Sequence, residues 1–212
     1  IVNDILIFRE DCSFEKLPPG AVIGTSSARR TAQLLSARSD LAIKPIRGNV
    51  ETRLRKVADG AYDATVLAKA GLARLGIVPE FSEILDVQQF LPAPAQGIVA
   101  LQTRMVDHSV FEPLIDSSHE QSFEALRAER AFLATLNAGC SSAVAAWSFY
   151  DENSTQHIHG RVLAEDGSGA VDVISGRKRN DSASRLGQLA AQALLQQGAD
   201  VFLGQIDDNE DF

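Results

Sequence analysis

The stretch Gly24–Gly76 decides the fold, and it reads GTSSARRTAQLLSARSDLAIKPIRGNVETRLRKVADGAYDATVLAKAGLARLG. In and just before it, short apolar runs alternate with segments of helical spacing. Strands are expected at three apolar runs: Ala21–Gly24, Leu41–Ile43 and Asp63–Ala68. Helices are expected after each run, over residues 28–39, 50–58 and 70–75. Strands separated by helices are typical of an α/β fold with a parallel sheet.

The same stretch is a basic island in an acidic protein. It holds ten Lys or Arg and four Asp or Glu, a balance of +6, whereas the whole chain carries −8. The rest of the chain therefore sums to −14. A net negative charge argues against broad nucleic-acid binding. The asymmetry indicates an anionic ligand held at one place.

Length and composition indicate a globular protein with a real core. The 212 residues suit one large domain or two small ones, and 45% of them are hydrophobic. No run approaches the ~20 apolar residues of a membrane helix. Cys12 and Cys140 lie far apart in no metal-type spacing, which favours a reducing, cytoplasmic setting. Because Ile1 is neither an initiator Met nor part of a signal peptide, we expect the chain to start partway through a longer protein.

The second half of the chain follows a different rhythm. The two prolines and the glycine of Phe90–Gly97 predict a hinge, and Ile98–Thr103 looks strand-like. A small α+β unit is expected next: a helix at Ser122–Leu136, strands at Ala143–Tyr150, Gln156–Ala164 and Ala170–Ser175, and a helix at Ser184–Gln197. The acidic tail Asp207–Asp211 is expected to fray.

The segment Gly24–Arg30 has the composition of an anion site. A strand that ends in Gly leads through the hydroxyls of Thr25 and Ser27 into a helix N-terminus, where free N–H groups favour negative charge. Arg29 and Arg30 add planar forks that suit carboxylates. The alternative is an ordinary capped helix with a solvated arginine pair, and the segment alone leaves both open.

The segment Arg47–Arg53 repeats this theme at the next strand end. Arg47 and Gly48 follow the second strand, Arg53 lies in the first turns of the next helix, and Arg74 follows the third strand less directly. Ligands of open α/β sheets bind at the carboxyl ends of the strands. Since these arginines share that edge with Arg29 and Arg30, the pattern predicts one binding site.

Other residues with reactive side chains carry weaker signals. Cys140 begins a loop after a helix, so it is either a nucleophile or attachment point, or an inert core residue. His157 and His159 alternate on a strand, which is weak support for a metal, and no metal site is expected. Trp147 and Phe149 are expected in the core.

Six separated motifs resemble the porphobilinogen deaminase family, also called hydroxymethylbilane synthase. They are GTSSARR at 24–30, RGNVETRL at 47–54, DATVLAKAGLARLG at 63–76, LPAPAQG at 91–97, AERAFL at 128–133 and GC at 139–140. Their order agrees with the family over most of the chain. Six motifs in order are far more specific than any one of them.

The resemblance implies a transferase of tetrapyrrole (haem) biosynthesis. The family condenses four porphobilinogen molecules with loss of ammonia and then releases the linear product by hydrolysis. The growing chain is held on a dipyrromethane cofactor, joined by a thioether to a cysteine that matches Cys140. By the same resemblance, cofactor-binding positions fall on Ser27, Arg29, Arg30, Arg47, Gly48 and Arg53. Substrate-binding positions fall on Thr25, Arg74 and Gln96.

The family fold also implies a domain division. Residues 1–91 match its second domain, which resembles periplasmic binding proteins, with a mixed sheet flanked by helices. Residues 92–119 match the hinge and the return segment of a first domain that is largely missing. Residues 120–212 match a small α+β C-terminal domain that carries the cysteine loop. The parent protein is expected to be a cytoplasmic monomer that binds neither nucleic acid nor membrane.

Three departures from the family shape what we expect. The motif that carries the family's catalytic Asp is absent, so no catalytic residue is named and the chain alone is expected to be inactive. Ala95 stands where Gly is usual, and no Pro follows Cys140. With its first domain incomplete, Ile98–Ile115 is expected to be poorly ordered or to pair with another copy. The alternative function is a non-catalytic carboxylate-binding module or decayed paralogue.

Overall fold

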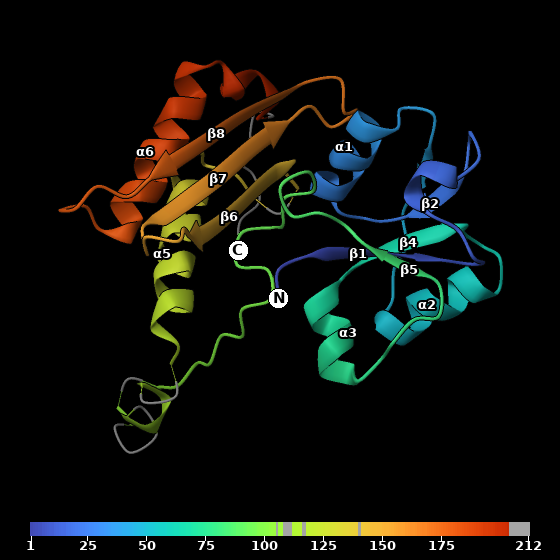
Figure 1. The fold of residues 1–212 in the computed structure, drawn as a ribbon, viewed down its shortest axis with the longest axis horizontal. Coiled ribbons are helices and arrows are strands. Elements are labelled where there is room, and N and C mark those ends of the chain that lie inside the picture. Colours follow the sequence, from blue (N-terminus) through green and yellow to red (C-terminus); the bar gives the residue numbers. More distant parts are fainter. Residues whose placement is uncertain (105, 108–111, 116–117, 140, 204–212) are drawn as a thin grey trace.

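A computed structural model describes residues 1–104, 106–107, 112–115, 118–139 and 141–203. In Figure 1 two units lie side by side, one built on a five-stranded sheet and the other on a three-stranded sheet. The hinge segment that follows β5 passes between them, close to the N-terminus. No helix among the described residues is both long and apolar enough to span a membrane.

The N-terminal unit alternates strands and helices. Its elements are β1 (Asp4–Phe8), η1 (Phe14–Lys16), β2 (Val22–Gly24), α1 (Ala28–Ala37), β3 (Ala42–Lys44), α2 (Val50–Ala58), β4 (Ala64–Ala68), α3 (Lys69–Leu75) and β5 (Ser82–Ile84). The strand order is β3-β2-β4-β1-β5. The elements predicted within and beside the basic island are therefore confirmed to within one or two residues.

The sheet is mixed and flanked by helices, as the family resemblance implied, whereas the parallel sheet expected from the alternation of strands and helices holds only for β2, β3 and β4. β2 runs parallel to β3 and β4, but β1 is inserted antiparallel between β4 and β5. All five residues of β1, DILIF, are buried. A strand that is buried on both faces reads as a continuous apolar run. This run was not recognised as a strand from the sequence.

Helices cover both faces of this sheet. Leu6, Ile23 and Val66 pack with Leu34 of α1 on one face, and each is almost fully buried. Ile5 and Leu67 pack on the other face, against the side of α2 and α3. Burying each such side chain contributes roughly 1.5–3 kcal/mol. The strand ends are thereby fixed in a rigid frame.

The C-terminal unit is an antiparallel sheet with helices on one face (Figure 1). Its elements are α5 (Glu120–Thr135), β6 (Val144–Tyr150), β7 (Gln156–Leu163), β8 (Ala170–Gly176), α6 (Ala183–Gln196) and η2 (Ala199–Phe202). The predicted α+β unit is confirmed in type and order. However, α5 begins at Glu120 and is capped by His119, two residues earlier than expected.

The sequence led us to expect Trp147 and Phe149 in the core, and this prediction is wrong. Both are half-buried on β6. Their rings stack on each other with centroids 4.4 Å apart, and Phe149 stacks on His157 at 5.4 Å. The core of this unit is formed from the alternate positions, which include Val144 and Ala146. The period of two along a strand sends the aromatic rings to the opposite face.

The hinge is irregular, as its prolines predicted. The carbonyl of Pro92 accepts a hydrogen bond from the Ala146 amide at 3.1 Å, which joins the hinge to β6. Beyond it, the strand expected at Ile98–Thr103 is absent from the described residues. Val99 and Leu101 are 59% and 65% exposed. An extended run without a neighbouring strand has no ladder to join, and pairing with a second copy stays a prediction.

Candidate carboxylate-binding site

The sheet topology gathers charged residues at one edge. The parallel strands β2, β3 and β4 end there, at Gly24, Lys44 and Ala68. Because β1 is antiparallel, its first residue lies at this same edge, and Asp4 pairs with Ala68. The N-terminus of α1, which directly follows β2, completes the site.

Asp4 is the centre of this edge. Its side chain is 0% exposed, and four donors surround the carboxylate. Arg29 Nη2 lies 2.9 Å from Oδ2. Arg30 donates from Nε to Oδ2 at 3.2 Å and from Nη2 to Oδ1 at 2.7 Å, and Gln96 Nε2 donates to Oδ1 at 2.9 Å. Two carboxylate oxygens offer about four lone-pair sites, so these donors saturate the group.

The two arginines are tied to the backbone as well. Arg29 Nη1 donates to the Leu91 carbonyl at 2.5 Å, and Arg30 Nη1 donates to the Val66 carbonyl at 3.1 Å. Arg29 is only 4% exposed, and its Nε has no hydrogen-bond partner among the described residues. Two guanidiniums against one carboxylate leave this cluster with one excess positive charge. The arrangement can therefore accept a further anion.

The charge of Asp4 follows from its partners. Burial alone would raise the pKa of this carboxyl, but the guanidiniums of Arg29 and Arg30 outweigh burial and hold its pKa below the ordinary value. Asp4 is therefore ionised at neutral pH.

The hinge is bound to the same cluster. Gln96 bridges Asp4 and the Val2 carbonyl, to which it donates at 2.6 Å. Gln33 of α1 pairs with both backbone groups of Leu91, donating at 3.0 Å and accepting at 2.8 Å. The position of the arginine pair and the path of the hinge are thus fixed by one network.

A second loop joins this edge through backbone contacts. The Ser26 hydroxyl donates to the Ile46 carbonyl at 3.0 Å, and the Thr25 amide donates to the Lys44 carbonyl at 3.0 Å. The loop that follows Ile46 carries the exposed Arg47 and Gly48. The predicted convergence of the two segments at one edge is therefore seen in the backbone.

Gly48 shapes this second loop. Its φ is +123°, and an added Cβ would approach the Thr52 side chain to 2.7 Å, so only glycine fits. The Gly48 carbonyl accepts from Arg53 Nε at 2.8 Å. Arg53 is half-buried, whereas Arg47 is exposed and contributes only its carbonyl, to Lys56 Nζ at 3.0 Å. We call the side chains of Arg47 and Arg53 the open rim, since their loop joins this edge through the contact of Ser26 with Ile46.

Other predicted residues have smaller parts. Ser27 is the N-cap of α1 and accepts from the Arg30 amide at 3.4 Å. Thr25 is buried and accepts from the Ser27 amide at 3.2 Å, so it orders the loop and does not face solvent. Arg74 is exposed in the last turn of α3, and no described hydrogen bond or ion pair joins it to the cluster.

Cys140 lies outside the described residues. Ala143, at the end of the same connection between α5 and β6, is buried against Ala32 of α1, with Ala28 packed beside them. The end of that connection therefore touches the helix that carries Arg29 and Arg30.

A second buried carboxyl faces the hinge from the C-terminal unit. Glu129 of α5 is 5% exposed and accepts from the amides of Ala95 at 2.6 Å and Ser148 at 2.8 Å. Burial raises the pKa of Glu129 to about 7. With Gln96, it lines a cavity of about 200 Å³ whose wall also includes Val2, His119, Ser122 and Tyr150.

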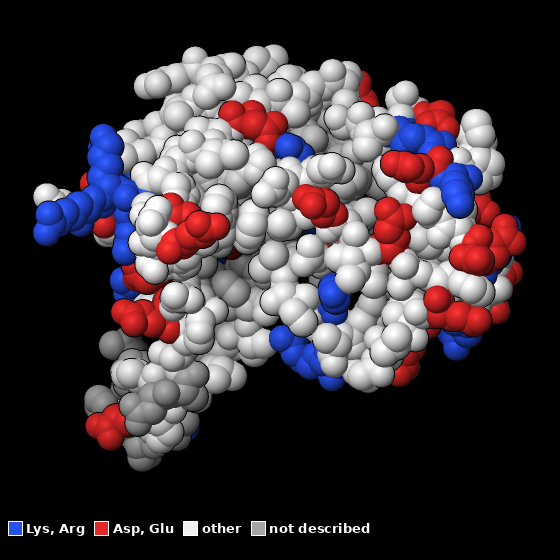
Figure 2. Space-filling model, in the orientation of Figure 1, with Lys and Arg blue, Asp and Glu red and all other residues white. Residues whose placement is uncertain are grey.

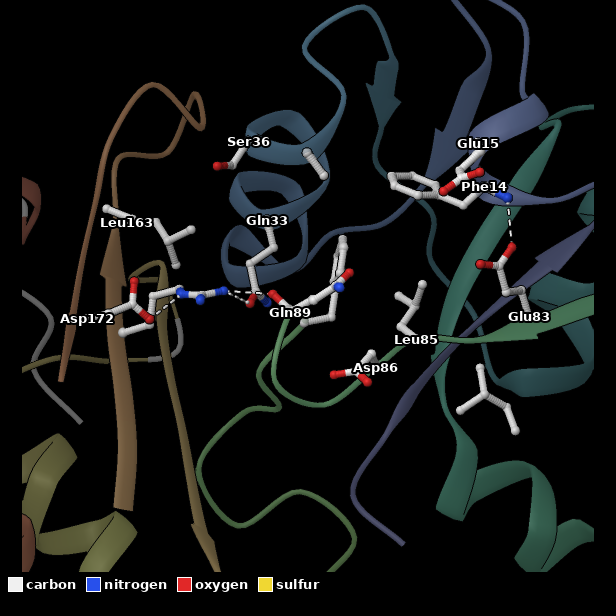
Figure 3. A pocket seen from close by; sticks show the side chains of 15 residues that line it. Phe14, Glu15, Gln33, Ser36, Glu83, Leu85, Asp86, Gln89, Leu163 and Asp172 are labelled. Carbon is white, nitrogen blue, oxygen red and sulfur yellow. Dashed lines mark hydrogen bonds and ion pairs between the residues drawn. The ribbon is translucent and has the colours of Figure 1, made fainter. Parts of the chain in front are cut away.

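A larger cavity lies elsewhere and contains none of the predicted site residues. Its volume is about 420 Å³, and it lies between α1 and β5 of one unit and β7 and β8 of the other. Figure 3 shows Gln33 and Ser36 facing Leu163 and Asp172, with Gln89 beside Gln33. Its lining includes four carboxylates and one cation, Arg161, which pairs with Asp172 at 2.7 Å, so the cavity suits an anion poorly. The smaller cavity meets the arginine cluster only through Gln96, which contacts Arg29 and Asp4.

Neither the charges on the face drawn in Figure 2 nor the metal-ligating side chains of the described residues form a competing site. On the face drawn in Figure 2, the described Lys and Arg residues are scattered among Asp and Glu and form no continuous stripe. His157 and His159 each bond an Asp, Asp151 and Asp172, at 2.9 Å. No group of three or more potential ligands among the described residues could hold a metal ion.

Sequence reasoning missed both buried carboxylates. Asp4 begins the apolar run DILIF, and a lone acid at the start of a buried strand was the available signal. Glu129 lies within the AERAFL motif, but nothing local marks its burial. Both acids depend on contacts that are remote in sequence, with Arg30 in one case and Ala95 in the other.

Two family models match the chain. Residues 1–112 match the dipyromethane cofactor binding domain of porphobilinogen deaminase. Residues 123–196 match the C-terminal domain of porphobilinogen deaminase.

Curated relatives agree with these models. A porphobilinogen deaminase of Thermus thermophilus is 41% identical over 96% of this chain and 67% of its own length. That of Thermobifida fusca is 42% identical over 93% of the chain and 64% of its own length. That of Alkaliphilus metalliredigens is 39% identical, over 95% and 63%. The chain thus spans about two thirds of the length of these relatives.

Proposed function

This chain belongs to the porphobilinogen deaminase family, and from this membership we propose that the protein acts as a hydroxymethylbilane synthase. It binds porphobilinogen, displaces its ammonia and joins four such units on a dipyrromethane cofactor before hydrolytic release. Of this reaction, the described residues contribute the binding of carboxylate side chains.

One observation carries the proposal: two arginines are held at the strand-end edge with one more positive charge than Asp4 neutralises. Each pyrrole of the substrate and cofactor carries two carboxylates, so a polypyrrole needs a group of cations. Arg29, which is buried, and Arg30, whose side chain is 12% exposed, supply a fixed pair, and Arg47 and Arg53 supply an open rim. A charge-assisted hydrogen bond to such a carboxylate contributes about 1.5–3 kcal/mol.

The residues fit a carboxylate-bearing cofactor. The excess positive charge and the unpartnered Arg29 Nε form an incomplete cradle for an anion. Arg29, Arg30, Arg47 and Arg53 would hold the carboxylates, and Ser27 and Gly48 would line the loops. Substrate would meet Gln96 beside the hinge, and Thr25 and Arg74 are retained as substrate-binding proposals. When bound, dipyrromethane supplies the anchor to which pyrroles are added.

The covalent attachment of the cofactor through Cys140 is also a proposal. The contact of Ala143 with α1 supports it, because the connection that contains Cys140 ends against the helix of the arginine pair. No catalytic acid is proposed from the described residues. Domain boundaries at 91 and 119 and a monomeric parent, with no nucleic-acid or membrane partner, stay proposals as well.

The test combines mass spectrometry with an activity assay. The complete gene product is purified, and the intact mass and the Cys140 peptide are examined for two added pyrrole units. Porphobilinogen consumption and hydroxymethylbilane formation are then followed, with Cys140→Ser as the variant that cannot attach the cofactor and Cys12→Ser as the matched control. The proposal expects the adduct and turnover in the parent and in Cys12→Ser, and neither in Cys140→Ser.

Two results would contradict the proposal. A free Cys140 thiol in the complete protein, with porphobilinogen left unconsumed, would support the carboxylate-binding module instead. Turnover that persists in Cys140→Ser would remove the thioether from the mechanism. The expected inactivity of the 212-residue chain is checked in the same assay, where product formation by this chain would refute it.

A further inference from the structure

Asp4 does not itself bind a ligand carboxylate in the proposed function, yet both guanidiniums of the arginine pair contact it. We propose that Asp4 is the positioning residue of the carboxylate site: it orients Arg29 and Arg30 so that a ligand carboxylate meets preformed donors. This inference rests on the proposed function only for the identity of the ligand as a pyrrole carboxylate. The positioning itself stands on the geometry.

The contacts of Arg30 show what Asp4 fixes. A guanidinium has five N–H groups in one plane. Arg30 uses two of them on Asp4, in a fork of 3.2 Å and 2.7 Å, and a third on the Val66 carbonyl. One N–H on each Nη remains without a partner among the described residues, and the side chain is 12% exposed. The fork thus holds the plane of Arg30 so that its free edge serves a ligand.

Arg29 is ordered by the same carboxylate. Its Nη2 lies within hydrogen-bond distance of Asp4 and Gln96, while its Nε is buried without a described partner. Gln96 also donates to Asp4, so the hinge and both arginines meet at one group. Preorganised donors bind more tightly because the ordering entropy has been lost before the ligand arrives.

The positioning role and simple electrostatics predict opposite changes in anion affinity when Asp4 is neutralised, so the direction of that change tests the proposal. If Asp4 were only a competing negative charge, its neutralisation would raise the excess charge of the cluster from +1 to +2 and strengthen anion binding. If Asp4 positions the arginines, its neutralisation weakens anion binding despite the added charge. A substitution that keeps the negative charge at position 4 but moves the carboxylate also distinguishes the positioning role from simple charge competition.

The experiment measures binding by calorimetry in a Cys140→Ser background, so that no thioether forms and the site is open to probes. The probes are glutarate, a plain dicarboxylate, and porphobilinogen. Asp4→Asn removes the charge, and Asp4→Glu keeps it with a longer side chain. Asp40→Asn is the matched control, because Asp40 also forms a two-pronged pair, with Arg38 beside the far end of α1, at 2.7 Å and 2.7 Å.

The expected result is weaker glutarate binding by about tenfold in Asp4→Asn and about threefold in Asp4→Glu, with no change in Asp40→Asn. In the parent, the Arg30 Nε–H signal in ¹⁵N–¹H spectra should shift on adding glutarate, and this response should be lost in Asp4→Asn. A purely structural role of Asp4 would lower thermal stability without these changes. Asp4→Glu still compensates the buried guanidiniums, so it decides the question if Asp4→Asn does not fold.

Tighter binding in Asp4→Asn, or parental affinity in Asp4→Glu, overturns the positioning role. A parent that binds neither probe overturns it as well, because the arginine pair is then no carboxylate site. A parent that binds glutarate but not porphobilinogen, with weaker glutarate binding in both Asp4 variants, supports positioning while the proposed function fails.

Discussion

Asp4 and Glu129 are two buried carboxyls that face the hinge from opposite units, and their pKa values are shifted in opposite directions. Their exposed fractions are 0% and 5%, and each contacts a hinge residue, Gln96 or Ala95. The pKa of Asp4 is held below its ordinary value, whereas that of Glu129 is raised to about 7. Burial is therefore common to both, and the difference comes from their partners.

The partners explain the contrast. Burial raises the pKa of both acids, but Asp4 also has two guanidiniums beside it, whereas the described partners of Glu129 are two backbone amides. A full positive charge at 2.7–2.9 Å outweighs desolvation, while two amide dipoles do not. The hinge is thus bounded by a permanent ion cluster on one side and a titrating acid on the other.

Removal of the Asp4 carboxylate should have the largest effect on stability. Asp4→Ala leaves two guanidiniums uncompensated at a buried site, and we expect a loss of about 3–5 kcal/mol in the free energy of unfolding at pH 7. Urea denaturation measures it. Asp40→Ala breaks an exposed pair and should lose less than about 1 kcal/mol. Equal losses in the two variants would mean that burial does not matter at Asp4.

The pH dependence of stability tests Glu129. Its pKa is about 7 in the folded protein against an ordinary value of 4.5, so the folded state binds more protons between these values. Stability from this group is present in full below pH 4.5 and is lost as pH rises to 7, by about 3 kcal/mol. Glu129→Gln should flatten this slope in unfolding measured from pH 4.5 to 7.5.

A nearby acid on the same helix provides the control for this slope. Glu124 forms a half-exposed pair with Arg177, and Glu124→Gln should keep the parental slope. Asp4 acts in the other direction, because its lowered pKa means that its stabilisation is lost only as pH falls below about 3.8. A Glu129→Gln profile as steep as the parental one would refute the assignment to Glu129.

A substitution in the hinge backbone between the two carboxyls should change the free energy of unfolding by a smaller amount. Ala95 has φ of +66°, a left-handed conformation that costs a non-glycine residue about 1–2 kcal/mol. Ala95→Gly should therefore raise the free energy of unfolding by about 0.5–1 kcal/mol, after the added entropy of the unfolded chain is subtracted. Thermal denaturation measures it. Ala93→Gly, at a residue without this φ, should lower stability instead.

The rim arginine should have the smallest effect on stability. Arg47 is exposed, and its side chain has no described partner, so Arg47→Met should change the free energy of unfolding by less than about 0.5 kcal/mol. The affinity of the Arg47→Met variant for glutarate, measured by calorimetry, should nevertheless be a few fold lower than that of the parent. Unchanged affinity would remove Arg47 from the site and confine binding to the buried pair.

Local patterns determined much of this protein. The alternation within the basic island indicated its strands and helices, Ser27 marked a helix start, and the prolines marked the hinge. These features depend on neighbours a few residues away, so the sequence carries them directly. The approach of the Arg29–Arg30 segment and the loop of Arg47 to one sheet edge followed from the same alternation, whereas Arg74 lies in the last turn of α3.

Tertiary structure decided what those arginines contact and which acids are charged. Asp4 meets Arg30 across 26 positions and Gln96 across 92, because β1 inserts antiparallel between β4 and β5. The run at Ile98–Thr103 failed as a strand for the same reason, since a strand requires a partner that its own residues do not specify. Strand pairing and pKa are properties of non-local contacts, so local sequence determined the elements of this site but not its chemistry.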